Sequence, residues 1–162
     1  MVKIAPSILS ADFSDLKNEI IAVDKAGADL IHIDIMDGNY VPNITFGPEA
    51  VRAISKHTKI NLDVHLMINP VLRFIEVFVE AGANIISFHP EVDANPIKII
   101  NLIKKLNCKA GIAIHPDIEV KKLNKYLDLV DDVVVMTVVP GFGGQNFMNN
   151  QINKIEILKN FF

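Results

Sequence analysis

Two segments of the sequence carry imidazole and carboxylate groups on one face of an otherwise apolar strand. In LIHIDIMDG, His32 and Asp34 alternate with isoleucines, so the two polar side chains point the same way. In NLDVHLMINP, Asp63 and His65 repeat this pattern. Two imidazoles and a carboxylate form a common ligand set for a divalent transition metal. The two segments therefore predict a metal or catalytic site shared between strands.

A purely structural role is the alternative, since a lone histidine on a strand is usually a hydrogen-bonded core residue. Here two histidines occur, each with an aspartate two residues away. An unpaired carboxylate inside a fold costs several kcal/mol. We therefore favour metal binding or catalysis by His32, Asp34 and His65. Asp63 lies one layer deeper, and we expect it to orient His65.

A glycine-rich segment and three methionines add to this pattern. MTVVPGFGGQNF follows the last predicted strand, and its glycines can turn sharply and present N–H groups to an anion. A flexible loop is the alternative, but a place on the same rim as the His/Asp set favours a substrate phosphate. Methionines at three strand ends could form a dry floor. The residues concerned are Met36, Met67, Met136, Gly141, Phe142, Gly143 and Gly144.

Composition narrows the class of protein. The 162 residues are 50% hydrophobic and 22% charged, which is typical of a globular protein. The net charge of −3, without a basic cluster, argues against nucleic acid as a partner. No apolar run is long enough to span a membrane. The single cysteine, Cys108, excludes an internal disulfide and suits the cytoplasm.

Strand and helix patterns alternate along the whole chain. Strands are predicted at residues 3–9, 30–36, 61–67, 85–89, 109–114 and 132–138. Helices are predicted at residues 16–26, 48–56, 70–81, 96–106, 118–127 and about 150–161. This order predicts an α/β fold with a parallel sheet. Ser7, the His32/Asp34 pair and His65 lie near the carboxyl ends of three strands, which favours a barrel over an open doubly wound sheet.

Taken together, these segments resemble the D-ribulose-5-phosphate 3-epimerase family. APSILSADF, HIDIMDGNYVPNITFGP, DVHLMINP, SFHPE and MTVVPGFGGQNF occur in the family's order and with similar spacing. The resemblance covers the whole chain and implies a (β/α)8 TIM barrel. Residues 1–162 would form a single incomplete domain with about six β/α units. The resemblance also implies a cytoplasmic enzyme of the pentose phosphate pathway.

The family's chemistry implies a role for each matching residue. The enzyme would be an isomerase that interconverts D-ribulose 5-phosphate and D-xylulose 5-phosphate. Asp34 would remove the C3 proton to give a cis-enediolate, and one divalent Zn, Fe, Mn or Co ion would assist. His32, Asp34 and His65 would bind that ion. The resemblance assigns substrate contacts to Ser7, His65, Met36, Met67, Met136, Gly141, Phe142, Gly143 and Gly144.

The sequence departs from the family pattern at its end. The second acid, an aspartate followed by glycines, and the seventh and eighth strands would lie beyond Phe162. We therefore expect the chain alone to be poorly stable and nearly inactive. Two other functions stay open: a hexulose-phosphate 3-epimerase, such as one acting on allulose 6-phosphate, and a non-catalytic metal- or phosphate-binding remnant. The chain is also compatible with a homo-oligomer.

Overall fold

Five parallel strands form one sheet in the computed structural model, which describes residues 2–161. They are β1 (Leu30–Met36), β2 (Asn61–Met67), β3 (Ile85–Phe88), β4 (Lys109–Ile114) and β5 (Asp132–Val135). Their order in the sheet is their order along the chain. A doubly wound sheet reverses its strand order at a switch point, whereas a barrel does not. The unbroken order therefore confirms the predicted barrel architecture.

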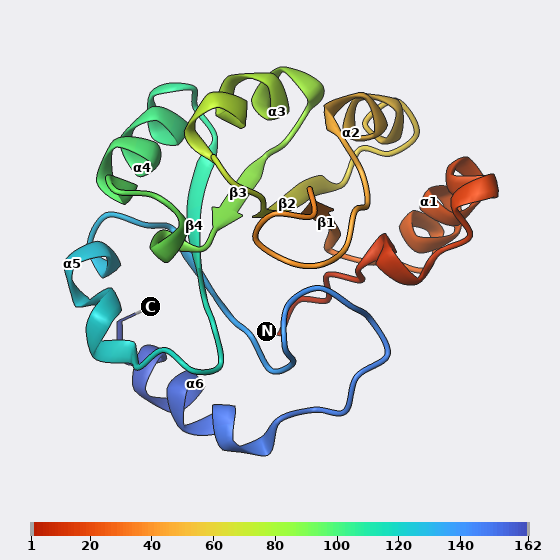
Figure 1. Cartoon of the computed structure of the whole chain (residues 1–162). Coiled ribbons are helices and arrows are strands. Elements are labelled where there is room, and N and C mark those ends of the chain that lie inside the picture. Colours follow the sequence, from red (N-terminus) through yellow and green to blue (C-terminus); the bar gives the residue numbers. More distant parts are fainter. Residues whose placement is uncertain (1, 162) are drawn as a thin grey trace.

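Residues 2–161 form six α-helices, which lie in a ring outside the strands (Figure 1). They are α1 (Leu16–Lys25), α2 (Pro48–Ile54), α3 (Ile75–Ala81), α4 (Pro96–Lys105), α5 (Asn124–Leu127) and α6 (Ile152–Leu158). All six predicted helices are present, and four of them (α1, α3, α5 and α6) directly follow a 3₁₀ turn, which is common at helix ends. Within residues 2–161, no helix combines the length and the apolar character needed to cross a membrane.

The prediction of a strand at residues 3–9 is wrong. The segment runs beside β1, and the backbone N–H of His32 donates to the carbonyl of Pro6 at 2.9 Å. Ser7 forms only an isolated bridge with His32, and the chain then turns into a 3₁₀ helix, Ile8–Ser10. Pro6 has no N–H to donate, and the Ser7 hydroxyl caps that turn, so the pairing ends early. The short pairing nevertheless holds Ser7 beside β1.

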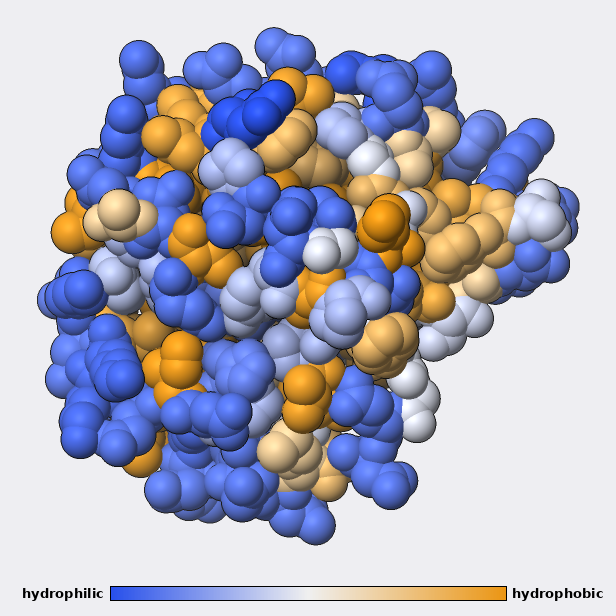
Figure 2. Space-filling view, in the orientation of Figure 1, coloured by the Kyte–Doolittle hydropathy of each residue, from blue (hydrophilic) through white to orange (hydrophobic). Residues whose placement is uncertain are grey.

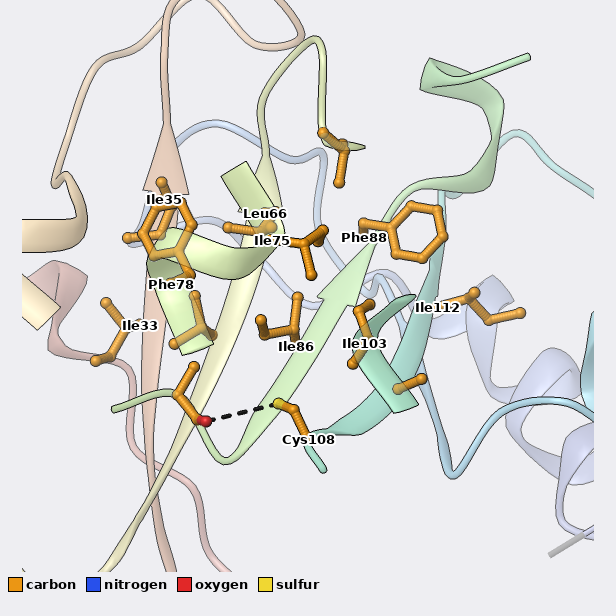
Figure 3. Packing of buried hydrophobic residues seen from close by; sticks show 14 of the residues in the cluster. Ile33, Ile35, Leu66, Ile75, Phe78, Ile86, Phe88, Ile103, Cys108 and Ile112 are labelled. Carbon is orange, nitrogen blue, oxygen red and sulfur yellow. Dashed lines mark hydrogen bonds between the residues drawn. The ribbon is translucent and has the colours of Figure 1, made fainter. Parts of the chain in front are cut away.

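The apolar face of the strands packs against the helices. Ile33 of β1 and Ile86 of β3 are fully buried, as is Phe78 of α3 (Figure 3). Fully burying a side chain of this size contributes roughly 1.5–3 kcal/mol. Because successive side chains alternate across a strand, this packing turns the polar residues of β1 toward the interior of the barrel. The core thus determines which face carries the His/Asp set.

A pair of glycines gives a test of this packing. Gly27 and Gly82 follow α1 and α3 with φ of +84° and +112°. A Cβ at Gly82 would lie 2.8 Å from the Cβ of Ser55, whereas at Gly27 it would meet nothing within 4 Å. Alanine at either site costs roughly 1–2 kcal/mol for the left-handed conformation. Gly82→Ala should lose about 1–3 kcal/mol more, because it also overpacks the contact with Ser55.

Urea unfolding of the two single variants measures this difference in the free energy of unfolding. Adding Ser55→Gly to Gly82→Ala should recover most of the overpacking cost, because it removes the Cβ that would be too close. Equal losses for the two single variants would contradict the expectation.

Candidate active site and metal centre

The register between β1 and β2 sets the site. Along these two strands His32 pairs with Asp63, Asp34 with His65, and Met36 with Met67. Parallel neighbours in register point to the same side of the sheet, so the six side chains form two adjacent rows on the interior face. The predicted convergence of two strands on one site therefore follows directly from the pairing.

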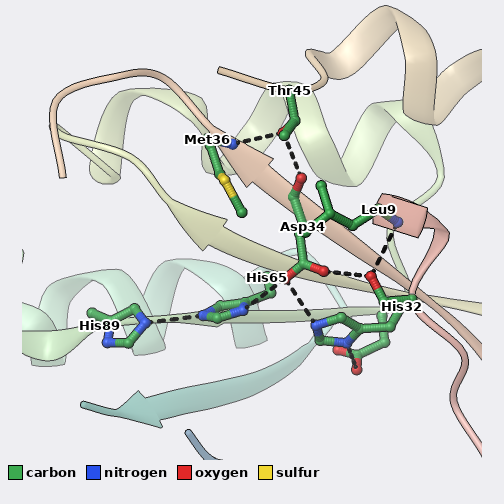
Figure 4. Close-up of polar contacts among 9 residues, drawn as sticks. Leu9, His32, Asp34, Met36, Thr45, His65 and His89 are labelled. Atoms are coloured by element: carbon green, nitrogen blue, oxygen red, sulfur yellow. Dashed lines mark hydrogen bonds and ion pairs between the residues drawn. The ribbon is translucent and has the colours of Figure 1, made fainter. Parts of the chain in front are cut away.

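Asp34 lies at the centre of the polar cluster (Figure 4). Its Oδ1 is 3.3 Å from the Nε2 of His32 and 3.3 Å from the Nδ1 of His65. Its other oxygen, Oδ2, accepts a hydrogen bond of 2.5 Å from the hydroxyl of Ser7. The structure thus brings together Ser7, His32, Asp34 and His65, four residues from three separate segments.

The donor set fits a divalent cation. One atom each of His32, Asp34 and His65 lie within 4.8 Å of one another. Two imidazole nitrogens and one carboxylate oxygen suit Zn²⁺, Fe²⁺, Mn²⁺ or Co²⁺, and three protein ligands leave a position open for substrate. The three side chains are therefore a candidate metal centre.

Asp63 contacts His32 and not His65, which corrects the prediction. Its Oδ2 lies 2.7 Å from the Nδ1 of His32. A carboxylate that accepts the Nδ1 proton fixes the ring of His32 with its Nε2 directed at Asp34. The reason for the difference is the register, which sets Asp63 beside His32 on the neighbouring strand.

The electrostatics favour a positive charge between these groups. Burial lowers the pKa of His32, but hydrogen bonds to Asp34 and Asp63 and their charges outweigh it and raise the pKa to about 10. Burial raises the pKa of Asp34, but its polar contacts with His32 and His65 and the charges of these groups outweigh it and hold that pKa well below its usual range. Asp34 is therefore an ionised carboxylate near neutral pH.

A cavity of about 180 Å³ lies above the cluster. Ser7 and Asp34 line it on the polar side. Met36 and Met67 are almost completely buried, and with Met136 they supply its sulfur-lined wall. The three methionines therefore line one cavity together with Asp34.

The glycine-rich loop closes the other side of the cavity. Gly141, Phe142 and Gly143 line it, whereas Gly144 lies outside the lining. The side chain of Asn43 donates to the carbonyl of Gly141 at 2.8 Å and ties this loop to the one after β1. Within residues 2–161, the N–H groups of residues 141–144 donate no hydrogen bond, and Phe142 and Gly143 are both exposed and part of the cavity lining.

Large apolar side chains, among them Ile44, Phe142 and Phe147, are exposed on the loops that follow β1 and β5. In Figure 2 apolar residues lie among hydrophilic ones across the visible face of the molecule. The predicted cavity residue Phe142 thus has a ring that is largely open to solvent, at 54% exposure.

Two further contributions did not follow from the sequence patterns, and a third, His89, was indicated only by its place at a strand end. Leu9 and Ser10 line the cavity from the turn after Ser7. The Thr45 hydroxyl donates to the carbonyl of Asp34 at 2.6 Å and anchors the end of β1. His89 is completely buried against His65. The SFHPE segment, with a histidine at a strand end and a carboxylate two residues later, carries the one signal for His89.

Known proteins match almost the whole chain. The model of the ribulose-phosphate 3 epimerase family matches residues 3–162. A ribulose-phosphate 3-epimerase of Bacillus subtilis is 50% identical over 98% of this chain and 73% of its own length. One from Rhodobacter capsulatus is 47% identical over 91% of this chain. The match covers 65% of that second relative, slightly less than two thirds of its length.

Solved structures agree on the fold. A mutant tryptophan synthase alpha-subunit of Pyrococcus furiosus aligns with 98% of this chain and 74% of its own length, with a TM-score of 0.72. At 12% sequence identity this likeness concerns the barrel fold alone. The family model and the sequence identity to the curated relatives identify the family as well as the fold. Together they show that the chain belongs to the ribulose-phosphate 3 epimerase family.

Proposed function

We propose that this site removes and returns the C3 proton of a phosphorylated ketopentose, as in the interconversion of D-ribulose 5-phosphate and D-xylulose 5-phosphate. The ionised carboxylate of Asp34 at the cavity wall, between two imidazoles, is the observation that carries the proposal. The names of the curated relatives support the choice of substrate. The reaction would belong to the pentose phosphate pathway in the cytoplasm.

Each residue of the site has a definite task in this proposal. Asp34 accepts the C3 proton and leaves an enediolate on the sugar. The Ser7 hydroxyl donates a hydrogen bond to the Oδ2 of Asp34 and so fixes the orientation of the carboxylate. Met36, Met67 and Met136 exclude water from the reacting carbons. The loop at residues 141–144 offers its free N–H groups to the phosphate.

His32, Asp34 and His65 would hold the divalent cation. When bound, the cation would polarise the C2 carbonyl and thereby make the C3 proton more acidic. Asp63 contacts the Nδ1 of His32 and so fixes the ring of this ligand.

Inversion at C3 needs a proton from the face opposite Asp34. Asp34 is the only carboxylate that lines the cavity in the part of the chain that the structure describes. Besides Asp34 and Asp63, Asp132 of β5 carries an interior carboxylate, and burial raises its pKa, but neither Asp63 nor Asp132 lines the cavity. We therefore expect this chain to exchange the C3 proton with solvent faster than it inverts the centre.

Proton NMR in D₂O tests this proposal. The chain is incubated with Zn²⁺ and D-ribulose 5-phosphate, and loss of the C3–H signal and the appearance of D-xylulose 5-phosphate are followed together. We expect exchange at C3 with slower epimerisation. Faster turnover of allulose 6-phosphate would instead favour a hexulose-phosphate epimerase. Binding of Zn²⁺ and phosphate without exchange at C3 would refute the proposal and favour a non-catalytic metal- or phosphate-binding protein.

A further inference from the structure

His65 has a second polar neighbour on the side away from Asp34. Its Nε2 lies 3.1 Å from the Nε2 of His89, and the two ring centroids are 5.1 Å apart (Figure 4). Both side chains are almost completely buried. Two imidazole nitrogens at this distance make a hydrogen bond only if one carries the proton and the other accepts it. The two rings therefore constrain each other's tautomers.

The contacts continue from His89 to the loop after β1. The Nδ1 of His89 lies 3.4 Å from the Oε1 of Glu91. Within residues 2–161 this nitrogen makes no hydrogen bond, so the Glu91 carboxylate is its ion-pair contact. The same carboxylate oxygen accepts a hydrogen bond of 2.8 Å from the hydroxyl of Tyr40, whose ring centroid is 4.7 Å from that of His89. A continuous line of side chains thus runs from Asp34 through His65 and His89 to Glu91 and Tyr40.

Counting protons along this line leaves two arrangements. Two neutral imidazoles carry two N–H groups on their four nitrogens. One N–H is used between the rings, so the other faces either Asp34 or Glu91. If the Nδ1 of His65 carries it, the Nδ1 lone pair of His89 faces the Glu91 carboxylate, which is repulsive. If the Nδ1 of His89 carries it, the Nδ1 lone pair of His65 faces Asp34, and this contact is repulsive until a cation lies between the two groups.

The second arrangement presents a lone pair and a carboxylate oxygen 3.3 Å apart, which suits a cation. We infer that His89 and Glu91 are positioning residues: they hold His65 in the tautomer whose Nδ1 lone pair points at Asp34, ready to bind a divalent metal. This inference rests on the metal centre of the proposed function. Tyr40 fixes the Glu91 oxygen by its hydrogen bond, and so connects the loop after β1 to the metal ligand.

Histidine ¹⁵N NMR tests the tautomers without an activity assay. The uniformly ¹⁵N-labelled full chain is compared before and after one equivalent of Zn²⁺. In the zinc-loaded protein we expect a protonated Nε2 and a zinc-shifted Nδ1 on His65, and a protonated Nδ1 on His89. Zinc on the Nε2 of His65, or a protonated Nε2 on His89, would overturn the inference.

Zinc affinity of variants, measured by competition with a chromophoric chelator, tests the role of Glu91. Glu91→Leu removes the acceptor and should weaken Zn²⁺ binding by about 10- to 100-fold. Glu91→Gln keeps an acceptor oxygen and should retain most of the affinity. Glu76→Leu, at an exposed position of α3, is the matched control and should bind like the wild type.

The outcomes separate this inference from the proposed function. A wild-type chain that binds no Zn²⁺ refutes the metal centre itself. A wild type that binds Zn²⁺ no more tightly than a folded Glu91→Leu variant refutes only the positioning role. Circular dichroism establishes whether Glu91→Leu folds, and if it does not, the ¹⁵N pattern of the wild type decides.

Discussion

Asp34→Asn is expected to slow exchange of the C3 proton by about 10²- to 10⁴-fold, the range for loss of a general base. The carboxamide has nearly the same shape, and its oxygen can still accept the hydrogen bond from Ser7. It cannot take up a proton from carbon near neutral pH. The rate of C3–H loss in D₂O at saturating D-ribulose 5-phosphate measures the effect.

A second aspartate provides the control for that variant. The side chain of Asp117 is 90% exposed and lies after β4, outside the cavity lining. Asp117→Asn should therefore exchange the C3 proton at the wild-type rate. Because Asp34 would also bind the cation, the zinc content of Asp34→Asn must be measured beside its rate. A folded Asp34→Asn chain that exchanges C3 as fast as the wild type would exclude Asp34 as the base.

His32→Gln is expected to weaken Zn²⁺ binding by more than about 100-fold, which is the upper range for loss of an outer partner of a metal ligand. His32 supplies one of the three converging donor atoms, and Asp63 holds its ring in place. Glutamine has neither the ring nitrogen nor the geometry to replace it. Isothermal titration of Zn²⁺ into the metal-free chain measures the affinity.

Removal of the metal should abolish exchange of the C3 proton. A chelator is expected to stop C3 exchange in the wild type, and added Zn²⁺ should restore it. His57, which is exposed at the end of α2, provides the control, because His57→Gln removes an imidazole that contacts none of the site residues. Equal zinc affinity of His32→Gln and the wild type would rule out the proposed ligand set.

The alternation of polar and apolar side chains along β1 and β2 could be predicted from the sequence. A strand places successive side chains on opposite faces, so His32, Asp34 and His65 had to share the polar face once these segments formed strands. The regular β/α spacing likewise predicted the parallel sheet and all six helices. These features depend on residues close together in the chain, which is why local patterns reveal them.

Which residues distant in the sequence contact one another was determined only by the tertiary structure. The register of β1 against β2 places Asp63 beside His32, although a shift of two residues would keep every side chain on its face and pair Asp63 differently. The first predicted strand did not form, because its pairing with β1 ends after the hydrogen bond from the His32 N–H to the Pro6 carbonyl. Beyond that point Ser7 caps a 3₁₀ turn.

His89 shows the same division most clearly. The sequence places this residue at a strand end but does not reveal which neighbour it meets, because its contacts come from two other segments. The fold brings His65 of β2 to one side of its ring and Tyr40 of the loop after β1 to the other. The sequence by itself thus determined which side chains face the interior of the barrel. The packing of neighbouring strands and loops decided which of them touch, because a contact across strands depends on register and not on spacing along the chain.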